Sequence, residues 1–164
     1  MGKTLIVYYS YTGNTRKIAN QLKDKIGGDI AEIETVVSYE GDYNSVVEQG
    51  QEEINSGYKP EIKQLSVIIN EYDTIILGTP VWWYTVAPAV LSFLSENGFT
   101  NKTIIPFATN GGWIGHTFKD IKALCPGANV VNEINIKYSE DMLSTSMKDI
   151  ESWIGKIKSG GFKK

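Results

Sequence analysis

The sequence predicts an α/β fold, a three-layer sandwich in which helices cover both faces of one five-stranded parallel sheet. Short apolar runs rich in β-branched side chains recur along the chain and predict strands. They are residues 4–9, 30–33, 74–78, 103–108 and 130–136. The first, third and fourth runs are nearly continuous rather than alternating. This pattern is typical of parallel strands that are buried on both faces.

Between these runs the apolar residues recur every three or four positions, which predicts amphipathic helices. Strand and helix therefore alternate five times, and short right-handed connections give the sandwich. Residues 43–57 are predicted as helix, and residues 62–69 as another turn or two. Asp42 and either Ser139 or Ser144 are predicted N-caps, and Pro88 suits a first helical turn. The helical sets are Ile18, Leu22 and Ile26; Val46, Val47 and Ile54; Val90, Leu91 and Leu94; Phe118, Ile121 and Leu124; and Ile150, Ile154 and Ile157.

Length and composition fit one domain that spans residues 1–164 and exclude several classes of function. The 16 basic and 19 acidic side chains give a net charge of -3, and no basic stripe favours nucleic acid as a partner. No apolar stretch approaches the length of a membrane span, and the N-terminal segment does not resemble a signal peptide. One cysteine and one histidine disfavour a disulfide or a metal site. We therefore expect a cytoplasmic protein without a metal or a membrane contact.

The loop after the first strand has the composition of a phosphate-binding loop. Ligands of open parallel sheets bind beyond the carboxyl ends of the strands, so the loops there are the candidates for chemistry. Residues 10–15 offer the hydroxyls of Ser10, Thr12 and Thr15, the Asn14 amide, a glycine and the free N–H groups of a helix N-terminus. The loop has no lysine and no Walker pattern, which disfavours triphosphate chemistry. A plain N-cap loop rich in small polar residues is the alternative.

The loop after the third strand, residues 79–88, carries Trp82, Trp83 and Tyr84 in succession. Three adjacent aromatic rings cannot all enter one core, and exposed rings at a strand end favour a flat partner. The interpretations are a planar ring ligand and a patch that contacts another subunit, and the two are compatible.

The loop after the fourth strand, residues 109–116, contains three glycines and Trp113. The glycines allow main-chain groups to approach the edge of a ligand, and Trp113 could cover one of its faces. A plain turn would also favour Asn-Gly-Gly. The three loops meet at one sheet edge, as a phosphorylated cofactor with a ring system requires.

The Ser-x-Thr-Gly-Asn-Thr loop resembles the phosphate loop of flavodoxins. Nearly the whole chain resembles short flavodoxin-like proteins of bacteria, and the resembling segments are residues 42–43, 59–62, 71–74, 80–83, 102–107 and 124–128. The resemblance implies the strand order 2-1-3-4-5, with FMN bound at the switch point between the first and third strands.

The resemblance also implies which residues contact FMN. Residues of the first loop would hold its phosphate, Trp82 would lie against the isoalloxazine, and Asn110 would help to bind the pyrimidine edge. The cofactor-binding residues predicted in this way are Ser10, Tyr11, Thr12, Gly13, Asn14, Thr15, Thr79, Pro80, Val81, Trp82, Trp83, Tyr84, Thr109, Asn110, Gly111, Gly112 and Trp113.

Two residues depart from the family pattern, which commonly has a glycine at the position of Tyr84 and a small residue at that of Trp113. A left-handed conformation at Trp83 or Tyr84 would cost about 1–2 kcal/mol. A carbonyl that rotates toward the flavin is therefore expected to be disfavoured. Trp113 suggests a more fully covered flavin face.

The predicted function is low-potential electron transfer by FMN between redox partner proteins. An NAD(P)H-dependent FMN reductase of quinones or similar acceptors is the alternative enzyme, and a flavin-less binding or signalling module is the third class. His116 could donate a proton, although a helix-start histidine that faces water is favoured. Cys125 is predicted to be a packed, inert thiol. No catalytic residue and no oligomeric state are assigned.

Overall fold

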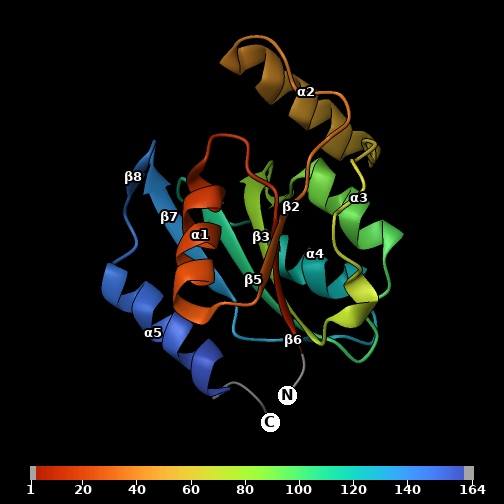
Figure 1. Ribbon diagram of the computed structural model, residues 1–164. Helices are drawn as coiled ribbons and strands as arrows, with labels where there is room; N and C mark the ends of the chain where they lie inside the picture. The colour runs from red at the N-terminus through yellow and green to blue at the C-terminus, as the bar shows by residue number, and fades with distance from the viewer. Residues whose placement is uncertain (1–2, 161–164) are drawn as a thin grey trace.

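The computed structural model describes residues 3–160, which form an eight-stranded sheet with helices on both faces (Figure 1). Its main path runs β2 (Asp29–Glu32), β1 (Thr4–Tyr8), β3 (Thr74–Trp82), β5 (Thr103–Asn110), β7 (Ile134–Ser139) and β8 (Met142–Leu143). All strands from β2 to β7 on this path pair in parallel. The predicted fold class and the strand order 2-1-3-4-5 are therefore confirmed.

Three short strands extend the predicted five. β4 (Thr85–Val86) pairs antiparallel with β3, β6 (Asn129–Val130) pairs parallel with β5, and β8 pairs antiparallel with β7. The run predicted as one strand, residues 130–136, is divided between β6 and β7. The break contains Asn132, whose φ of 53° is left-handed and incompatible with a continuous strand.

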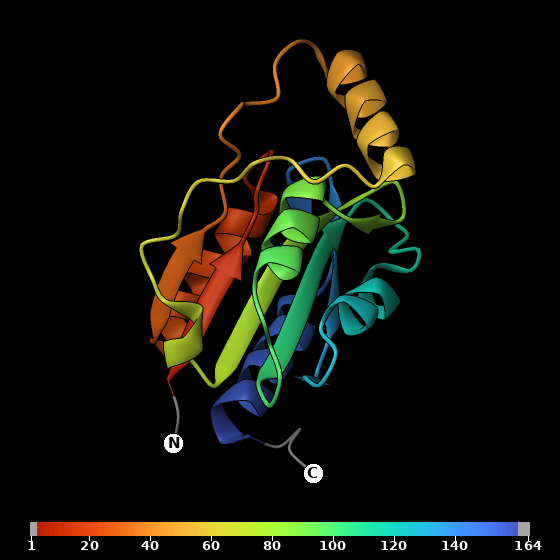
Figure 2. The same cartoon turned by 90° about the vertical axis from the view of Figure 1, so that its right-hand side faces the viewer.

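The helices form two layers. Figures 1 and 2 show α1 (Asn14–Ile26) and α5 (Met147–Ser159) on one face, and α3 (Pro88–Glu96) and α4 (Thr117–Leu124) on the other. Successive residues of the central strands point to opposite faces. Ile6 and Ile76 therefore pack with α1 and α5, whereas Leu5 and Ile75 pack in the core beneath α3 and α4.

A further helix, α2 (Tyr43–Ser56), stands beyond the carboxyl ends of the strands instead of lying on the sheet (Figure 1). Asp42 caps it by accepting a hydrogen bond from the Ser45 N–H at 2.8 Å, so this predicted cap is confirmed. Ser139 and Ser144 are not the cap of α5, because the Ser146 side chain holds that position. The helical turns predicted for residues 62–69 are also absent apart from the short helix η1 (Ile69–Glu71), since Ile62 instead bridges to Thr35.

The described residues contain no helix long and apolar enough to cross a membrane.

Candidate functional site

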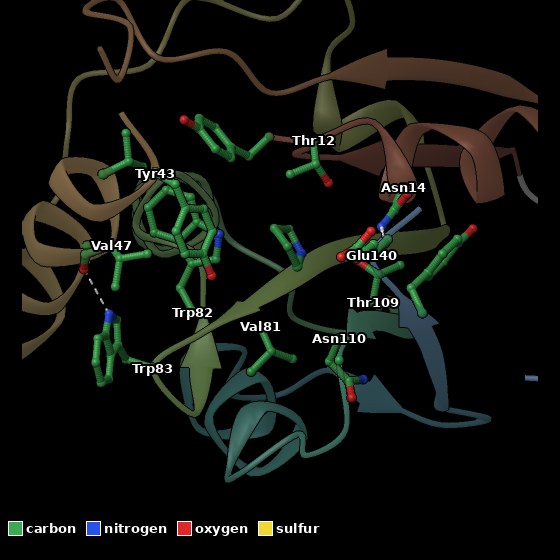
Figure 3. A pocket seen from close by; sticks show the side chains of 16 residues that line it. Thr12, Asn14, Tyr43, Val47, Val81, Trp82, Trp83, Thr109, Asn110 and Glu140 are labelled. Atoms are coloured by element: carbon green, nitrogen blue, oxygen red, sulfur yellow. Dashed lines mark hydrogen bonds between the residues drawn. The ribbon is translucent and has the colours of Figure 1, made fainter. Parts of the chain in front are cut away.

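A cavity of about 550 Å³ lies where β1, β3 and β5 end, and α2 forms its outer wall. Figure 3 shows Asn14, Thr109 and Glu140 close together at one end, and Tyr43 and Val47 with the two tryptophans at the other. The volume is in the range of ordinary cofactor pockets. The lining residues are Tyr11, Thr12, Asn14, Tyr43, Val46, Val47, Gly50, Pro80, Val81, Trp82, Trp83, Thr109, Asn110, Gly111, Tyr138 and Glu140.

Residues 10–13 form a short loop between β1 and α1, and Asn14 and Thr15 begin the helix. Gly13 has a φ of 106°, and a Cβ there would have no neighbour within 4 Å, so the turn is open. The Ser10 hydroxyl faces inward and accepts from the N–H groups of Gly13 at 3.1 Å and Arg16 at 3.2 Å. Ser10 therefore braces the loop, while Thr12 and Asn14 face the cavity.

The floor of this end is fixed by hydroxyl and amide contacts from β5. The buried hydroxyls of Thr15 and Thr109 are hydrogen-bonded at 2.8 Å, which ties the start of α1 to the end of β5. The Asn110 side chain accepts from the Gly112 N–H at 3.0 Å and donates to the Asn135 side chain. The bond between Thr15 and Thr109 thus links the segments that follow the first and fourth predicted strands.

Glu140 is the only charged residue among the described residues that line the cavity. Its main-chain oxygen accepts from the Asn14 amide at 2.9 Å. The single arginine of the sequence, Arg16, forms an ion pair with Glu32 at 2.5 Å. An anion at this end would therefore be held by N–H groups and hydroxyls at a helix N-terminus instead of by a cation.

The tryptophan pair attaches α2 to the rest of the site. The Trp83 indole N–H donates to the Val47 carbonyl at 3.0 Å. Trp82 lies against Gly50, where an added Cβ would stand 3.0 Å from Cε3 of the indole. Its ring also makes edge contacts with Tyr11 and Tyr39, with centroids 5.8 and 5.1 Å away. Both tryptophans thus line the cavity and anchor its outer wall.

A buried carboxylate completes this anchor. Glu53 of α2 is 8% exposed, and it accepts hydrogen bonds from the Tyr39 hydroxyl at 2.6 Å and from the Gln49 amide at 2.8 Å. Burial, followed by the hydrogen bond to Glu53, raises the pKa of Tyr39 above its ordinary value. Tyr39 therefore remains a hydrogen-bond donor to Glu53 throughout the neutral range.

The turn from β3 to β4 contains two successive left-handed residues, Trp83 with a φ of 49° and Tyr84 with a φ of 71°. This is the conformation that the sequence indicated to be costly without glycine. The chain adopts it because Trp82 pairs with Thr85 across a two-residue hairpin, whose right-handed twist favours left-handed turn residues. The folded protein therefore already contains the unfavourable left-handed conformation at both residues.

Several predicted residues support the cavity without lining it. Thr79 is buried, and its hydroxyl accepts from the Ala87 N–H at 3.2 Å. Trp113 is 67% exposed and packs on Tyr84 with ring centroids 4.7 Å apart, on the outer side of the turn. The predicted residues outside the lining are Ser10, Gly13, Thr15, Thr79, Tyr84, Gly112 and Trp113.

The sequence did not indicate that α2 or the β7–β8 hairpin would reach the site. Tyr43, Val46, Val47 and Gly50 come from α2, and the hairpin supplies Glu140. One signal was present, namely a glycine in the middle of a predicted helix, which often marks a close approach.

His116 and Cys125 both lie outside the cavity. His116 is exposed at the N-terminus of α4, and its Nδ1 is paired with Asp120. Cys125 is buried, and burial raises the pKa of its thiol to about 11. This agrees with the prediction of a packed, unreactive thiol.

Comparison with known protein families identifies the family to which this chain belongs. The flavodoxin family model matches residues 3–157. The chain belongs to the flavodoxin family. The resemblance seen in residues 10–15 therefore extends through the sheet and α2.

Solved flavodoxin-like structures share the fold over nearly the full length. A protein from Bacteroides uniformis that is inferred to be a flavoprotein is 28% identical, covers 94% of this chain and 98% of its own, and has a TM-score of 0.80. A flavoprotein from Lactobacillus acidophilus, solved in complex with FMN, is 26% identical, with coverage of 93% and 99% and a TM-score of 0.71.

A curated relative from Chromohalobacter salexigens, an NAD(P)H dehydrogenase (quinone), is 28% identical over 60% of this chain. The chain spans about half of that relative's length, since the match covers 48% of it.

Proposed function

We propose that this flavodoxin-family protein binds FMN in the cavity and transfers electrons at low potential between redox partners. The main observation behind this proposal is that a single cavity has two different ends. One end is a loop without Lys or Arg at a helix N-terminus, and the other is a wall of aromatic side chains. A phosphate monoester fits the first part and a planar ring fits the second. Family membership and the FMN complex of a similar structure support the same cofactor.

The residues present fit FMN. Thr12 and Asn14 would bind the phosphate together with main-chain N–H groups of the loop, and Gly13 leaves room for its close approach. Trp82 and Trp83 would border the ring system, and the main chain near Asn110 and Gly111 would meet its polar edge. Bound FMN would supply the electron-carrying ring. The chain would bind it, orient it and exclude water from it.

The aromatic wall and the single carboxylate among the described lining residues, that of Glu140, support a low reduction potential. Electron-rich rings and Glu140 disfavour added negative charge in the cavity. We further propose a cytoplasmic location, which the single, buried cysteine supports because its thiol is reduced there.

The test is a comparison of FMN with riboflavin. The purified protein should show a flavin visible spectrum, or acquire one on titration with FMN, with quenching of tryptophan fluorescence. Thr12→Ala should weaken FMN binding by roughly 1–3 kcal/mol and riboflavin binding much less, because only FMN carries the phosphate. Thr100→Ala, an exposed position before β5 at the opposite sheet edge, is the matched control.

Equal losses for the two flavins would show that this loop does not hold a phosphate. Absence of binding to either flavin would favour the third class, a binding or signalling module without a cofactor.

The second candidate is an NAD(P)H-dependent FMN reductase of quinones or similar acceptors. The relative from Chromohalobacter salexigens favours it, as does the uncharged wall of Val46, Val47 and Gly50 at the ring end of the cavity, which suits a flat neutral acceptor. Stopped-flow mixing of the FMN-loaded protein with NADH and NADPH distinguishes the two candidates. Rapid nicotinamide oxidation supports the reductase. A flavin that is reduced only through a partner protein supports the electron carrier.

A further inference from the structure

The turn at Trp83 and Tyr84 is held from outside the cavity by the segment that begins α4. The hairpin that contains it carries Trp82 and Trp83, which form the aromatic wall of the site. The residues behind the turn do not line the cavity, and the proposed function gives them no role.

The first contact is made by the main chain. The His116 N–H donates to the Tyr84 carbonyl at 2.8 Å. Gly115 makes this approach possible, because a Cβ built on it would stand 2.4 to 2.6 Å from the Cβ, O and Cα atoms of Tyr84. Gly115 also has a φ of 56°, so a side chain would be disfavoured by its conformation as well. The Tyr84 carbonyl is thereby committed to His116.

The second contact is made by side chains. The Thr85 hydroxyl, directly after the turn, donates to Oδ2 of Asp120 in the first turn of α4. The same oxygen pairs with Nδ1 of His116. A single carboxylate thus joins the strand that leaves the turn to the residue whose N–H holds the turn.

We propose that Thr85, Gly115, His116 and Asp120 are positioning residues that hold the left-handed turn and, through it, the tryptophan wall of the FMN site. A non-glycine turn of this kind is unfavourable by itself, so it persists only where surrounding contacts determine it. The inference rests on the proposed function for its effect on FMN. Its structural part can be measured without flavin.

A matched pair of variants at Thr85 isolates the hydroxyl. Thr85→Val removes the donor with little change of shape, and Thr85→Ser retains the donor. In the flavin-free protein, Thr85→Val should raise the hydrogen-exchange rate of the His116 amide about three- to tenfold, the loss expected for one hydrogen bond. Thr85→Ser should exchange like the unaltered protein. Asp120→Ala should resemble Thr85→Val, and the double variant should add little, because both changes break one network.

With FMN bound, Thr85→Val and Asp120→Ala should weaken binding about three- to tenfold and shift the midpoint potential of the flavin, whereas Thr85→Ser should do neither. The midpoint potential of the flavin is the decisive measurement. A residue with only a general structural role would lower the stability of the protein without changing that potential. Gly115→Ala should change FMN affinity and the midpoint potential more than Thr85→Val does. Its control is Gly98→Ala, since a Cβ at Gly98 meets nothing within 4 Å.

Unchanged His116 exchange in Thr85→Val would overturn the proposal, and so would a Thr85→Ser variant as defective as Thr85→Val. An unchanged FMN potential in Thr85→Val would overturn the link to the site. Failure of the unaltered protein to bind FMN would refute the proposed function instead, while the exchange measurements would still decide whether the turn is held in this way.

Discussion

Helices α2 and α5 are similar in local design and different in what holds them. They have 14 and 13 residues, each begins with a side-chain cap, and each ends at a left-handed glycine. Each also contains one interior glycine, Gly50 in α2 and Gly155 in α5. The residues that α5 buries are Ile150, Trp153 and Ile154, whereas α2 buries Val46, Gly50 and Glu53.

The difference shows two ways of placing a helix. An apolar stripe places α5 on the sheet, where any well-packed set of large side chains serves the same purpose. A few specific contacts place α2 over the cavity, namely those of Trp82 with Gly50, Trp83 with Val47 and Tyr39 with Glu53. We therefore expect substitutions in α5 to change global stability, and substitutions in α2 to change the site.

The largest expected effect is that of Trp153→Ala in α5. Trp153 is 3% exposed, packs against Phe107, and donates its indole N–H to the Asn132 carbonyl at 2.6 Å. Its loss should lower the free energy of unfolding in urea by about 3–5 kcal/mol and leave the FMN affinity of the folded protein unchanged. Trp113→Ala is the control, since that ring is exposed and should cost less than about 0.5 kcal/mol. A loss below 1 kcal/mol for Trp153→Ala would contradict an apolar anchor for α5.

The next effect is that of Glu53→Ala in α2. Removal of this carboxylate leaves the half-buried Tyr39 hydroxyl without its acceptor, at a cost of about 1–3 kcal/mol. The loss should appear as faster hydrogen exchange confined to α2 and as weaker FMN binding. The neighbouring Glu52→Ala, at an exposed position, should change neither quantity. Exchange that accelerates uniformly through the sheet would show instead that α2 is part of the global folding unit.

The paired variants Gly50→Ala and Gly155→Ala compare the two helices directly. Alanine in a helix interior is more stable than glycine by up to about 1 kcal/mol, and Gly155→Ala should show that gain because its Cβ has no neighbour within 4 Å. At Gly50 the added Cβ stands 3.0 Å from Trp82, so the indole or α2 must shift. We expect little net gain in stability there, a changed tryptophan emission and a several-fold change in FMN affinity. If both variants gain equally and bind FMN alike, Gly50 does not set the position of α2.

The sequence predicted the features that follow from local pattern. Continuous apolar runs located the strands, and hydroxyls with a glycine at a strand end indicated a loop of which Thr12 and Asn14 line the cavity. The helix of α2 was predicted as well, with its Asp42 cap. Its position over the cavity was not, because that depends on contacts between residues far apart in sequence, such as Trp83 and Val47. The separation of Trp113 from the cavity depends in the same way on its packing against Tyr84.

The smallest expected effect is that of low pH on the first turns of α2 and α5. It should distinguish the two helices because their N-caps differ in charge. The main-chain N–H of Ser45 lowers the pKa of Asp42 below its ordinary 3.8. A carboxyl whose pKa is lower in the folded protein stabilises it above the unfolded value, and loses that contribution as pH falls through the folded value. The first turn of α2 should therefore fray as the pH falls below about 4.

The first turn of α5 has the Ser146 hydroxyl as its cap, which has no charge to lose over this range. Amide exchange at Ser45 and at Asp149, whose N–H groups donate to the two caps, should therefore separate on acidification, with Ser45 accelerating more than Asp149. Asp42→Ser gives α2 the same kind of cap as α5 and should abolish the difference. If Ser45 still accelerates in that variant, the acid response does not arise from the Asp42 cap.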